Sequence, residues 1–173
     1  GYGDYEIPAQ PDRGIWMGLS MDVDRSGGAH TGRLYIAFAD QGDLDGDDDA
    51  DDPADPADNP DSATDHHNTD IFVLASDDKG ASWTTRAGSP DIALSNGSVA
   101  TVRVSDDAGT SSQFFSWLDV DQANGNVAVS WYDARNDTGA APQEGDALVN
   151  SDVQYFAAFS TDGGTHWGEP VWL

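Results

Sequence analysis

The residues most suggestive of chemistry are a run of aspartates in the first half of the chain. Between positions 43 and 61 the sequence reads DLDGDDDADDPADPADNPD. Crowded carboxylates repel one another, and a hard cation bound through oxygen relieves that repulsion. The Asp-x-Asp-x-Asp spacing therefore predicts a calcium loop. Its predicted ligands are Asp43, Asp45, Asp47 and Asp49, with Asp51 and Asp52 as the weaker candidates.

A second interpretation of this acidic run stays open. In the EF-hand loop a glycine stands at the sixth position and a glutamate closes the site, whereas here Asp48 takes the glycine position and no glutamate follows. Charge repulsion and the repeated prolines would also suit a solvated, extended insertion without a metal. The sequence alone is compatible with either.

Two other polar clusters carry candidate chemistry. Asp133, Arg135 and Asp137 lie in the segment WYDARND. Arg135 with Asp133 could bind a glycan or form a structural ion pair. His66 and His67 suit a transition metal by type, but adjacent residues of a strand point to opposite faces, which favours a surface loop instead.

Composition excludes several classes of partner. The 173 residues contain 32 acidic against 7 basic residues, a formal net charge of −25. Recognition of nucleic acid or of an anionic membrane surface needs clustered lysine and arginine, so both are disfavoured. No apolar run approaches the roughly 20 residues that span a bilayer. With no cysteine, a hydrophobic content of 38% and 6 tryptophans, stability must come from a packed core or from bound cations.

The elements that would position these residues are strands. Short runs with apolar residues at every second position, bounded by Gly, Asp, Asn and Pro, recur along the chain, and no helical period is sustained. The chain is therefore expected to be all-β. The predicted strands are 17–23, 33–39, 70–76, 99–105, 114–120, 126–132, 153–159 and 170–173. Trp16, Trp117, Trp131 and Tyr132 could stack on sugars, but their strand pattern favours a place in the core.

The chain also repeats itself. Residues 32–40 (GRLYIAFAD) align with 125–133 (GNVAVSWYD), and residues 76–83 (SDDKGASW) align with 160–167 (STDGGTHW). The order of the matching segments is the same in both halves. Each half would supply four strands joined by tight turns, the layout of a propeller blade.

The two Ser-x-Asp-x-Gly-x-x-Trp segments resemble the Asp-box, or BNR, repeat of sialidase-like β-propellers. The matching residues are Ser76, Asp78, Gly80, Ser82 and Trp83 in the first copy and Ser160, Asp162, Gly164 and Trp167 in the second. The resemblance implies that each aspartate binds backbone N–H groups of a turn and that each tryptophan packs between blades. His166 stands where Ser or Thr is expected, which puts one turn hydrogen bond of the second copy in question.

The resemblance predicts two blades of a six- or seven-bladed propeller. Residues 15–105 would form the first, with an acidic insert at 43–69, and residues 106–173 the second, with a polar insert at 136–151. Segment 1–14 would hold the outer strand of a preceding blade. The remaining blades would come from a longer chain or from symmetry-related copies.

In function, the resemblance implies a secreted, extracellular bacterial protein. The leading hypothesis is a calcium-stabilised module for carbohydrate or surface binding or for structural assembly, in which no catalytic residue is assigned. One alternative is an exo-acting, sialidase-like glycoside hydrolase whose catalytic residues lie outside this chain. Another is a purely structural filament or surface-layer subunit. Asp133, Arg135 and Asp137 would lie on the ligand face.

Overall fold

The computed structural model describes residues 5–7, 10–16, 18–40, 69–83, 102–105, 111–137 and 152–173. These residues form strands and turns and contain no helix, so the prediction of an all-β chain is confirmed for them. The six predicted calcium ligands and the pair His66 and His67 lie outside the described residues.

The first four-stranded sheet is antiparallel and runs in the order β3-β4-β5-β6. Its strands are β3 (Ser20–Val23), β4 (Leu34–Asp40), β5 (Asp70–Ser76) and β6 (Val102–Arg103). Strand β3 starts later than the expected residue 17, because Gly18 N–H donates to the Trp16 carbonyl at 2.7 Å in a tight turn. We call this sheet 1.

The second four-stranded sheet, sheet 2, repeats this layout in the order β7-β8-β9-β10. Its strands are β7 (Gln113–Val120), β8 (Val127–Asp133), β9 (Gln154–Ser160) and β10 (Val171–Trp172). The N-terminal segment forms a separate two-stranded hairpin of β1 (Tyr5–Ile7) and β2 (Gln10–Ile15), which pairs with neither larger sheet.

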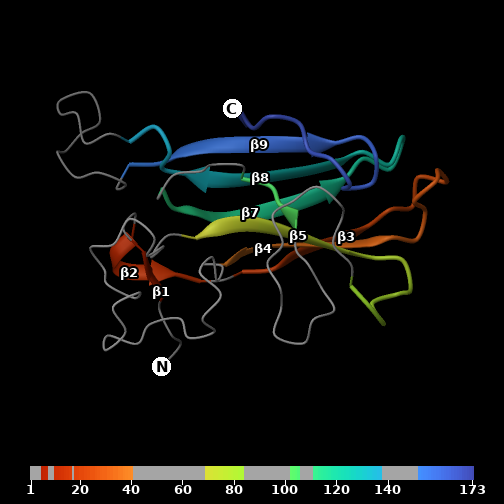
Figure 1. Ribbon diagram of the computed structural model, residues 1–173, viewed down its shortest axis with the longest axis horizontal. Helices are drawn as coiled ribbons and strands as arrows, with labels where there is room; N and C mark the ends of the chain where they lie inside the picture. Colours follow the sequence, from red (N-terminus) through yellow and green to blue (C-terminus); the bar gives the residue numbers. More distant parts are fainter. Residues whose placement is uncertain are drawn as a thin grey trace.

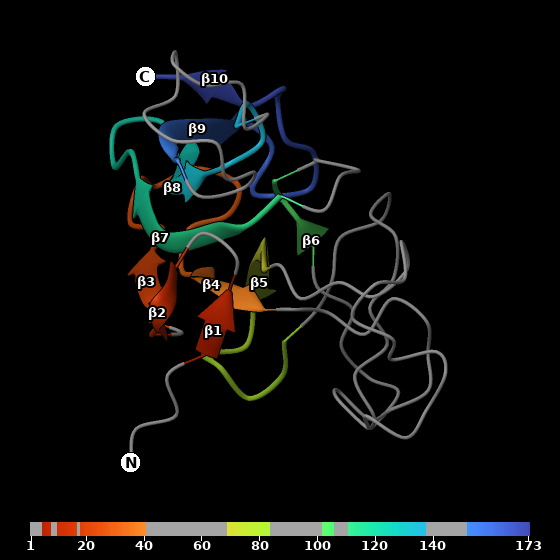
Figure 2. The same ribbon diagram turned by 90° about the vertical axis from the view of Figure 1, so that its left-hand side faces the viewer.

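The two larger sheets pack face to face, and the core lies between them (Figures 1 and 2). Alternate residues of each strand point into this layer, as the period of a strand requires. Sheet 1 contributes Tyr35 and Ile71, and sheet 2 contributes Val129, Trp131 and Phe156, all at most 5% exposed.

Not every aromatic residue of the strand pattern is in this core. Trp131 is fully buried, as expected, but Trp16 is 78% exposed, Trp117 is 68% exposed and Tyr132 is 41% exposed. The expectation of burial is therefore wrong for these three residues. Trp117 and Tyr132 belong to the face of sheet 2 that points away from sheet 1, where the described residues provide no covering layer.

The strand order brings like features to the same end of both sheets. The hairpins that follow β5 and β9 lie together at the right of Figure 1, and the β1–β2 hairpin lies near the other end. We call the end with the hairpins after β5 and β9 the box end, and the opposite end of the sheets the loop end. Asp70 and Asp133 lie at the loop end, because Asp70 pairs with Asp40 and Asp133 with Gln113 and Gln154.

Candidate functional site

The hairpin after β5 is closed by side chains of the first box. The Ser82 N–H donates to Asp78 Oδ1 at 2.8 Å, and the Ser82 hydroxyl donates to Asp78 Oδ2 at 2.6 Å. The Gly80 N–H donates to Ser76 Oγ at 2.8 Å. Lys79 and Gly80 have positive φ values of 64° and 85°, so the turn needs a glycine at its tightest point. A short aspartate therefore organises this hairpin from within.

The hairpin after β9 has the same geometry with a different residue. The His166 N–H donates to Asp162 Oδ1 at 2.9 Å, and His166 Nδ1 lies 2.6 Å from Asp162 Oδ2. The Gly164 N–H donates to Ser160 Oγ at 2.8 Å. The imidazole thus takes the place of the Ser82 hydroxyl. The side-chain hydrogen bond to the box aspartate, which the change from Ser or Thr to His166 put in question, is made by the histidine ring.

These hydrogen bonds favour the ionised form of both aspartates. Side-chain and backbone donors of Ser82, followed by Ser76, lower the pKa of Asp78 to about 2. For Asp162, burial raises the pKa, but hydrogen bonds from His166 and Ser160 outweigh it and lower the pKa to about 2. Hydrogen bonds to a carboxylate stabilise its charged state in this way.

We expect acid to weaken both hairpins over a defined range. Because the folded pKa values lie below the ordinary value of 3.8, the carboxylates stabilise the fold fully above about pH 4, and the contribution is lost as pH falls towards 2. Replacing Asp78 and Asp162 by Asn should lower the melting temperature at pH 7 and make its fall between pH 4 and 2 shallower. Thermal melts followed by circular dichroism across pH 2–7 measure this. The exposed variant Glu169→Gln is the control, and an equally steep fall in the double variant would contradict the assignment.

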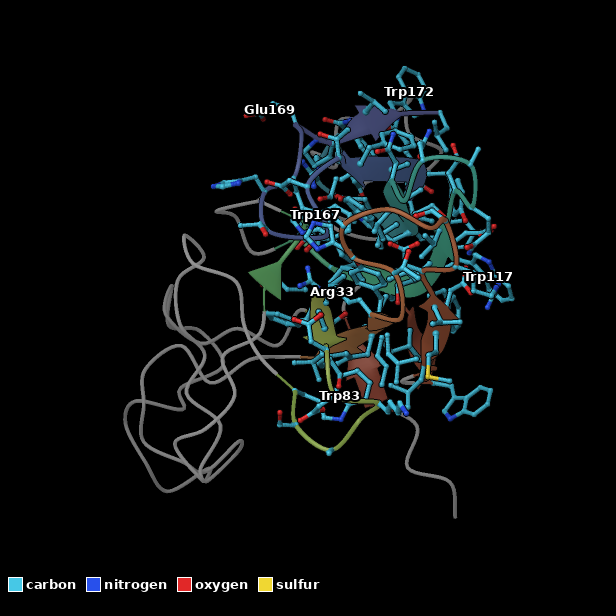
Figure 3. The ribbon with its side chains drawn as sticks, turned by 90° about the vertical axis from the view of Figure 1, so that its right-hand side faces the viewer. Arg33, Trp83, Trp117, Trp167, Glu169 and Trp172 are labelled. Atoms are coloured by element: carbon cyan, nitrogen blue, oxygen red, sulfur yellow. The ribbon has the colours of Figure 1, made fainter. Side chains whose placement is uncertain are left out.

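The two box tryptophans hold equivalent places on successive sheets. Trp167 packs against the core between the sheets, whereas Trp83 lies on the far side of sheet 1 (Figure 3). Ring atoms of both tryptophans approach the glycine of their own box, Gly164 and Gly80. Trp167 therefore covers an interface that exists in the described residues, and Trp83 occupies the same position on a sheet face that sheet 2 does not cover.

Arg33 links the two boxes, a role that no sequence motif marks. Its Nε and Nη2 atoms donate to the two carboxylate oxygens of Asp77, at 2.6 and 2.8 Å. Its Nη1 donates to the Gly163 carbonyl of the other hairpin at 2.9 Å. The Arg33 side chain is only 6% exposed. One buried guanidinium thus joins sheet 1 to the second box (Figure 3).

At the loop end, Asp133 is the centre of a buried polar cluster. The Trp131 indole N–H donates to Asp133 Oδ2 at 2.7 Å, and the Arg135 backbone N–H donates to Oδ1 at 2.9 Å. The guanidinium of Arg135 forms an ion pair with Oδ2, its Nη2 lying 2.7 Å away. Asp133 is 1% exposed, so its charge is balanced inside the protein.

Arg135 extends this cluster to sheet 1. Its Nη2 donates to the Ser105 carbonyl at 2.5 Å, and its guanidinium carbon lies 4.8 Å from the centre of the Phe156 ring. The Ser105 hydroxyl in turn donates to Asp70 Oδ1 at 2.8 Å. Of these contacts, only that of Arg135 with Ser105 crosses from sheet 2 to sheet 1, so it forms only when the two sheets pack and could not be read from the sequence.

The third predicted ligand-face residue is separate from this pair. Asp137 is 8% exposed, and its Oδ2 accepts the Asp152 N–H at 2.8 Å, which joins the two chain segments that leave and re-enter the loop end. The structure therefore brings Asp133 and Arg135 together as an ion pair. The Asp137 carboxylate instead accepts a hydrogen bond from the backbone N–H of Asp152.

The carboxylates of the loop end that the structure describes are engaged by the protein itself. The carboxylates of Asp133 and Asp137 both accept hydrogen bonds from within the protein. The described residues contain no group of three His, Asp or Glu side chains arranged to hold a metal ion. They also include no helix with the length and apolar character needed to cross a membrane.

Comparison with other proteins leaves the geometry as the main guide. A scan against protein-family models found no match for this sequence, and a search of curated proteins found none either.

Proposed function

We propose that the chain supplies consecutive blades of a sialidase-like, Asp-box β-propeller and acts as a secreted, extracellular module for carbohydrate or surface binding. The observation that supports this most concerns which faces of the two sheets meet. Sheet 2 turns one face towards sheet 1, and sheet 1 turns the opposite, non-equivalent face towards sheet 2. A propeller blade shows one face to the preceding blade and the opposite face to the next, so the direction of stacking is what a propeller requires.

The direction follows from the repeat and the burial of equivalent residues. In β8, Val127 and Trp131 face sheet 1 and are fully buried. Their equivalents in β4, Leu34 and Phe38, are only half-buried and point away from sheet 2. Conversely, Tyr35 faces sheet 2 and is fully buried, whereas its equivalent Ala128 points outward.

The buried ion pair at the loop end suits a supporting role beneath a binding surface. Asp133 and Arg135 neutralise each other in the interior, which suits support of a surface better than acid or base catalysis, where a carboxyl group must exchange a proton with its substrate. The glycan would then bind at the loop end of the two sheets. Within this proposal the Asp-box end serves stability.

Binding and turnover of a glycan separate this proposal from its alternative. The purified chain should be retained by glycans on a printed array and should release no fluorophore from a sialoside. Turnover that disappears in Asp137→Asn, with the melting temperature unchanged, would contradict the proposal and favour a glycoside hydrolase. A chain that neither binds nor turns over any glycan would contradict the binding role and favour a structural subunit.

Calcium remains part of the proposal on the sequence of residues 43–52. An ion that binds only the folded state stabilises it by mass action, by about 2.7 kcal/mol at 100 times its dissociation constant. Adding EDTA to the calcium-loaded chain should therefore lower the melting temperature by several degrees, and excess Ca²⁺ should restore it. Replacing Asp43, Asp45 and Asp47 by Asn should abolish the response, and an EDTA shift that persists in this variant would place the ion elsewhere.

A further inference from the structure

We propose that His30 and Arg33 form a docking notch on sheet 1 that accepts an Asp-box turn only when the fourth residue of the box is glycine. The second box has Gly163 at this position and fits the notch, whereas the first box has Lys79 and does not. The notch therefore specifies that sheet 2, and not a sheet 1 from a second copy, packs beside sheet 1. This inference does not depend on glycan binding or on the number of blades.

The notch is built by the turn that leads into β4. The Arg33 N–H donates to the His30 carbonyl at 2.9 Å, which closes a tight turn between the two residues. The base of this turn is held by Asp24, whose N–H donates to the Arg33 carbonyl at 2.9 Å and whose carbonyl accepts the Gly32 N–H at 2.7 Å. Arg33 is buried and His30 is half-buried. Both side chains are thus held in place beside the first strand pair of sheet 1.

The second box fits this notch because it has no side chain at its fourth position. Gly163 is buried, and its carbonyl accepts the hydrogen bond from Arg33 Nη1. A Cβ atom added to Gly163 would lie 2.5 Å from His30 Cδ2 and 2.7 Å from both His30 Cγ and Arg33 Nη1. These distances are far shorter than the roughly 3.5–4.0 Å of a favourable contact between carbon atoms. The notch therefore reads the backbone of the turn and rejects a side chain.

The first box shows that the turn itself does not require this glycine. Lys79 stands at the same position with a φ of 64°, close to the 73° of Gly163. Lys79 is exposed, whereas Gly163 is buried. The two boxes thus share a backbone conformation and differ in whether a neighbouring turn packs against the fourth residue. Contact with the notch explains the glycine better than the backbone angle does.

Charge adds to the rejection of the first box. A docked first box would bring the Lys79 ammonium towards the Arg33 guanidinium, which is only 6% exposed. Like charges repel most strongly where water is excluded, and steric and charge rejection of the wrong partner are common means of specificity. Misassembly between similar units is a characteristic failure of repeat proteins. The lysine in one box and the glycine in the other would guard against it.

Sheet 2 does not repeat the notch. In the aligned segments, Asn126 takes the place of Arg33, and Thr161 of the second box takes the place of Asp77. Asn126 has neither the charge nor the length of an arginine side chain. The notch therefore specifies one junction, that of sheet 1 with sheet 2, and any sheet packed on the other face of sheet 2 would dock by different contacts.

Exchanging the fourth residues of the two boxes tests the proposal. The double variant Lys79→Gly with Gly163→Lys keeps the composition, the net charge and one lysine at a positive φ. The exchange should lower the melting temperature by several degrees, as should Gly163→Lys alone, because the lysine enters the notch. Lys79→Gly alone is the control and should change it little. An exchanged chain as stable as the unaltered one would mean that glycine serves only the turn, which would overturn the proposal.

A double-mutant cycle isolates the contact with His30 and also decides the matter if the exchanged chain does not fold. Gly163→Ala should lower the urea midpoint more than Gly27→Ala does, because Gly27 has a φ of 81° but no atom within 4 Å of an added Cβ. In a His30→Ala background the effect of Gly163→Ala should shrink, since the imidazole supplies two of the three closest contacts. Equal losses with and without the imidazole, or a loss no larger than that of Gly27→Ala, would contradict a notch formed by His30 and Arg33.

Discussion

Replacing Arg33 by Met should destabilise the protein by roughly 2 kcal/mol, within the range for hydrogen bonds to a charged group, because Asp77 is 59% exposed and water solvates its carboxylate once the arginine is gone. Methionine keeps the apolar stem of the side chain but provides no donor. The change would leave the Gly163 carbonyl without the guanidinium N–H and would remove the two hydrogen bonds to Asp77. For a chain of this size the melting temperature should fall by roughly 6 °C.

Arg25 offers a matched control for this variant. Its guanidinium also pairs with an aspartate, Asp22, but at 3.3 Å and with 61% of the arginine side chain exposed. Exposed pairs of this kind contribute about 0–1 kcal/mol, so Arg25→Met should leave the denaturation midpoint in urea nearly unchanged. If both arginine variants had equal, small effects, Arg33 would not be the link between the two boxes that its contacts describe.

The strands were predictable because their signal is local. A continuous apolar run of five residues between Asp70 and Ser76 placed this strand with both ends correct, and both of its faces are largely buried. The repeat also gave the equivalence of the two halves. Neither signal requires knowledge of what lies opposite a given residue in space.

The local pattern could not show where a strand departs from regularity. Strand β7 has a bulge between Phe114 and Trp117, and Phe115 takes a φ of 53°, which is uncommon for a residue other than glycine. Apolar residues stand on both sides of this position in the sequence, so no alternation marks it. The bulge matters for the surface, because it places the Phe115 ring beside Tyr132.

The candidate sites were predictable only in part for a related reason. Asp133 and Arg135 are two residues apart, so their pairing could be weighed from sequence alone. The contacts of Arg33 with Asp77 and Gly163 join residues separated by 44 and 130 positions, which only the antiparallel pairing of β4 with β5 and the stacking of the sheets bring together. A lone arginine at the start of an apolar strand in so acidic a chain was the signal available.

Replacing Asp133 by Ala should be the most damaging single change at the loop end, at about 3–5 kcal/mol. The variant would leave the guanidinium of Arg135, whose side chain is 19% exposed, without its carboxylate, and the buried Trp131 indole N–H without its acceptor. Asp133→Asn keeps an oxygen for the indole and loses only the charge, so we expect it to lie between alanine and the unaltered chain. Urea denaturation at pH 7 measures all three.

The same series distinguishes support from direct contact with a ligand. The exposed Glu169→Ala provides the reference, since removing a carboxylate from the surface should change stability by no more than about 0.5 kcal/mol. If Asp133 acts through the fold, glycan retention by Asp133→Asn should match that of the unaltered chain at a temperature where both are folded. A variant that is as stable as the unaltered chain but no longer retains glycan would instead assign Asp133 to the binding surface. The short contacts of its carboxylate with Trp131 and Arg135, inside the protein, are the reason to expect the first result.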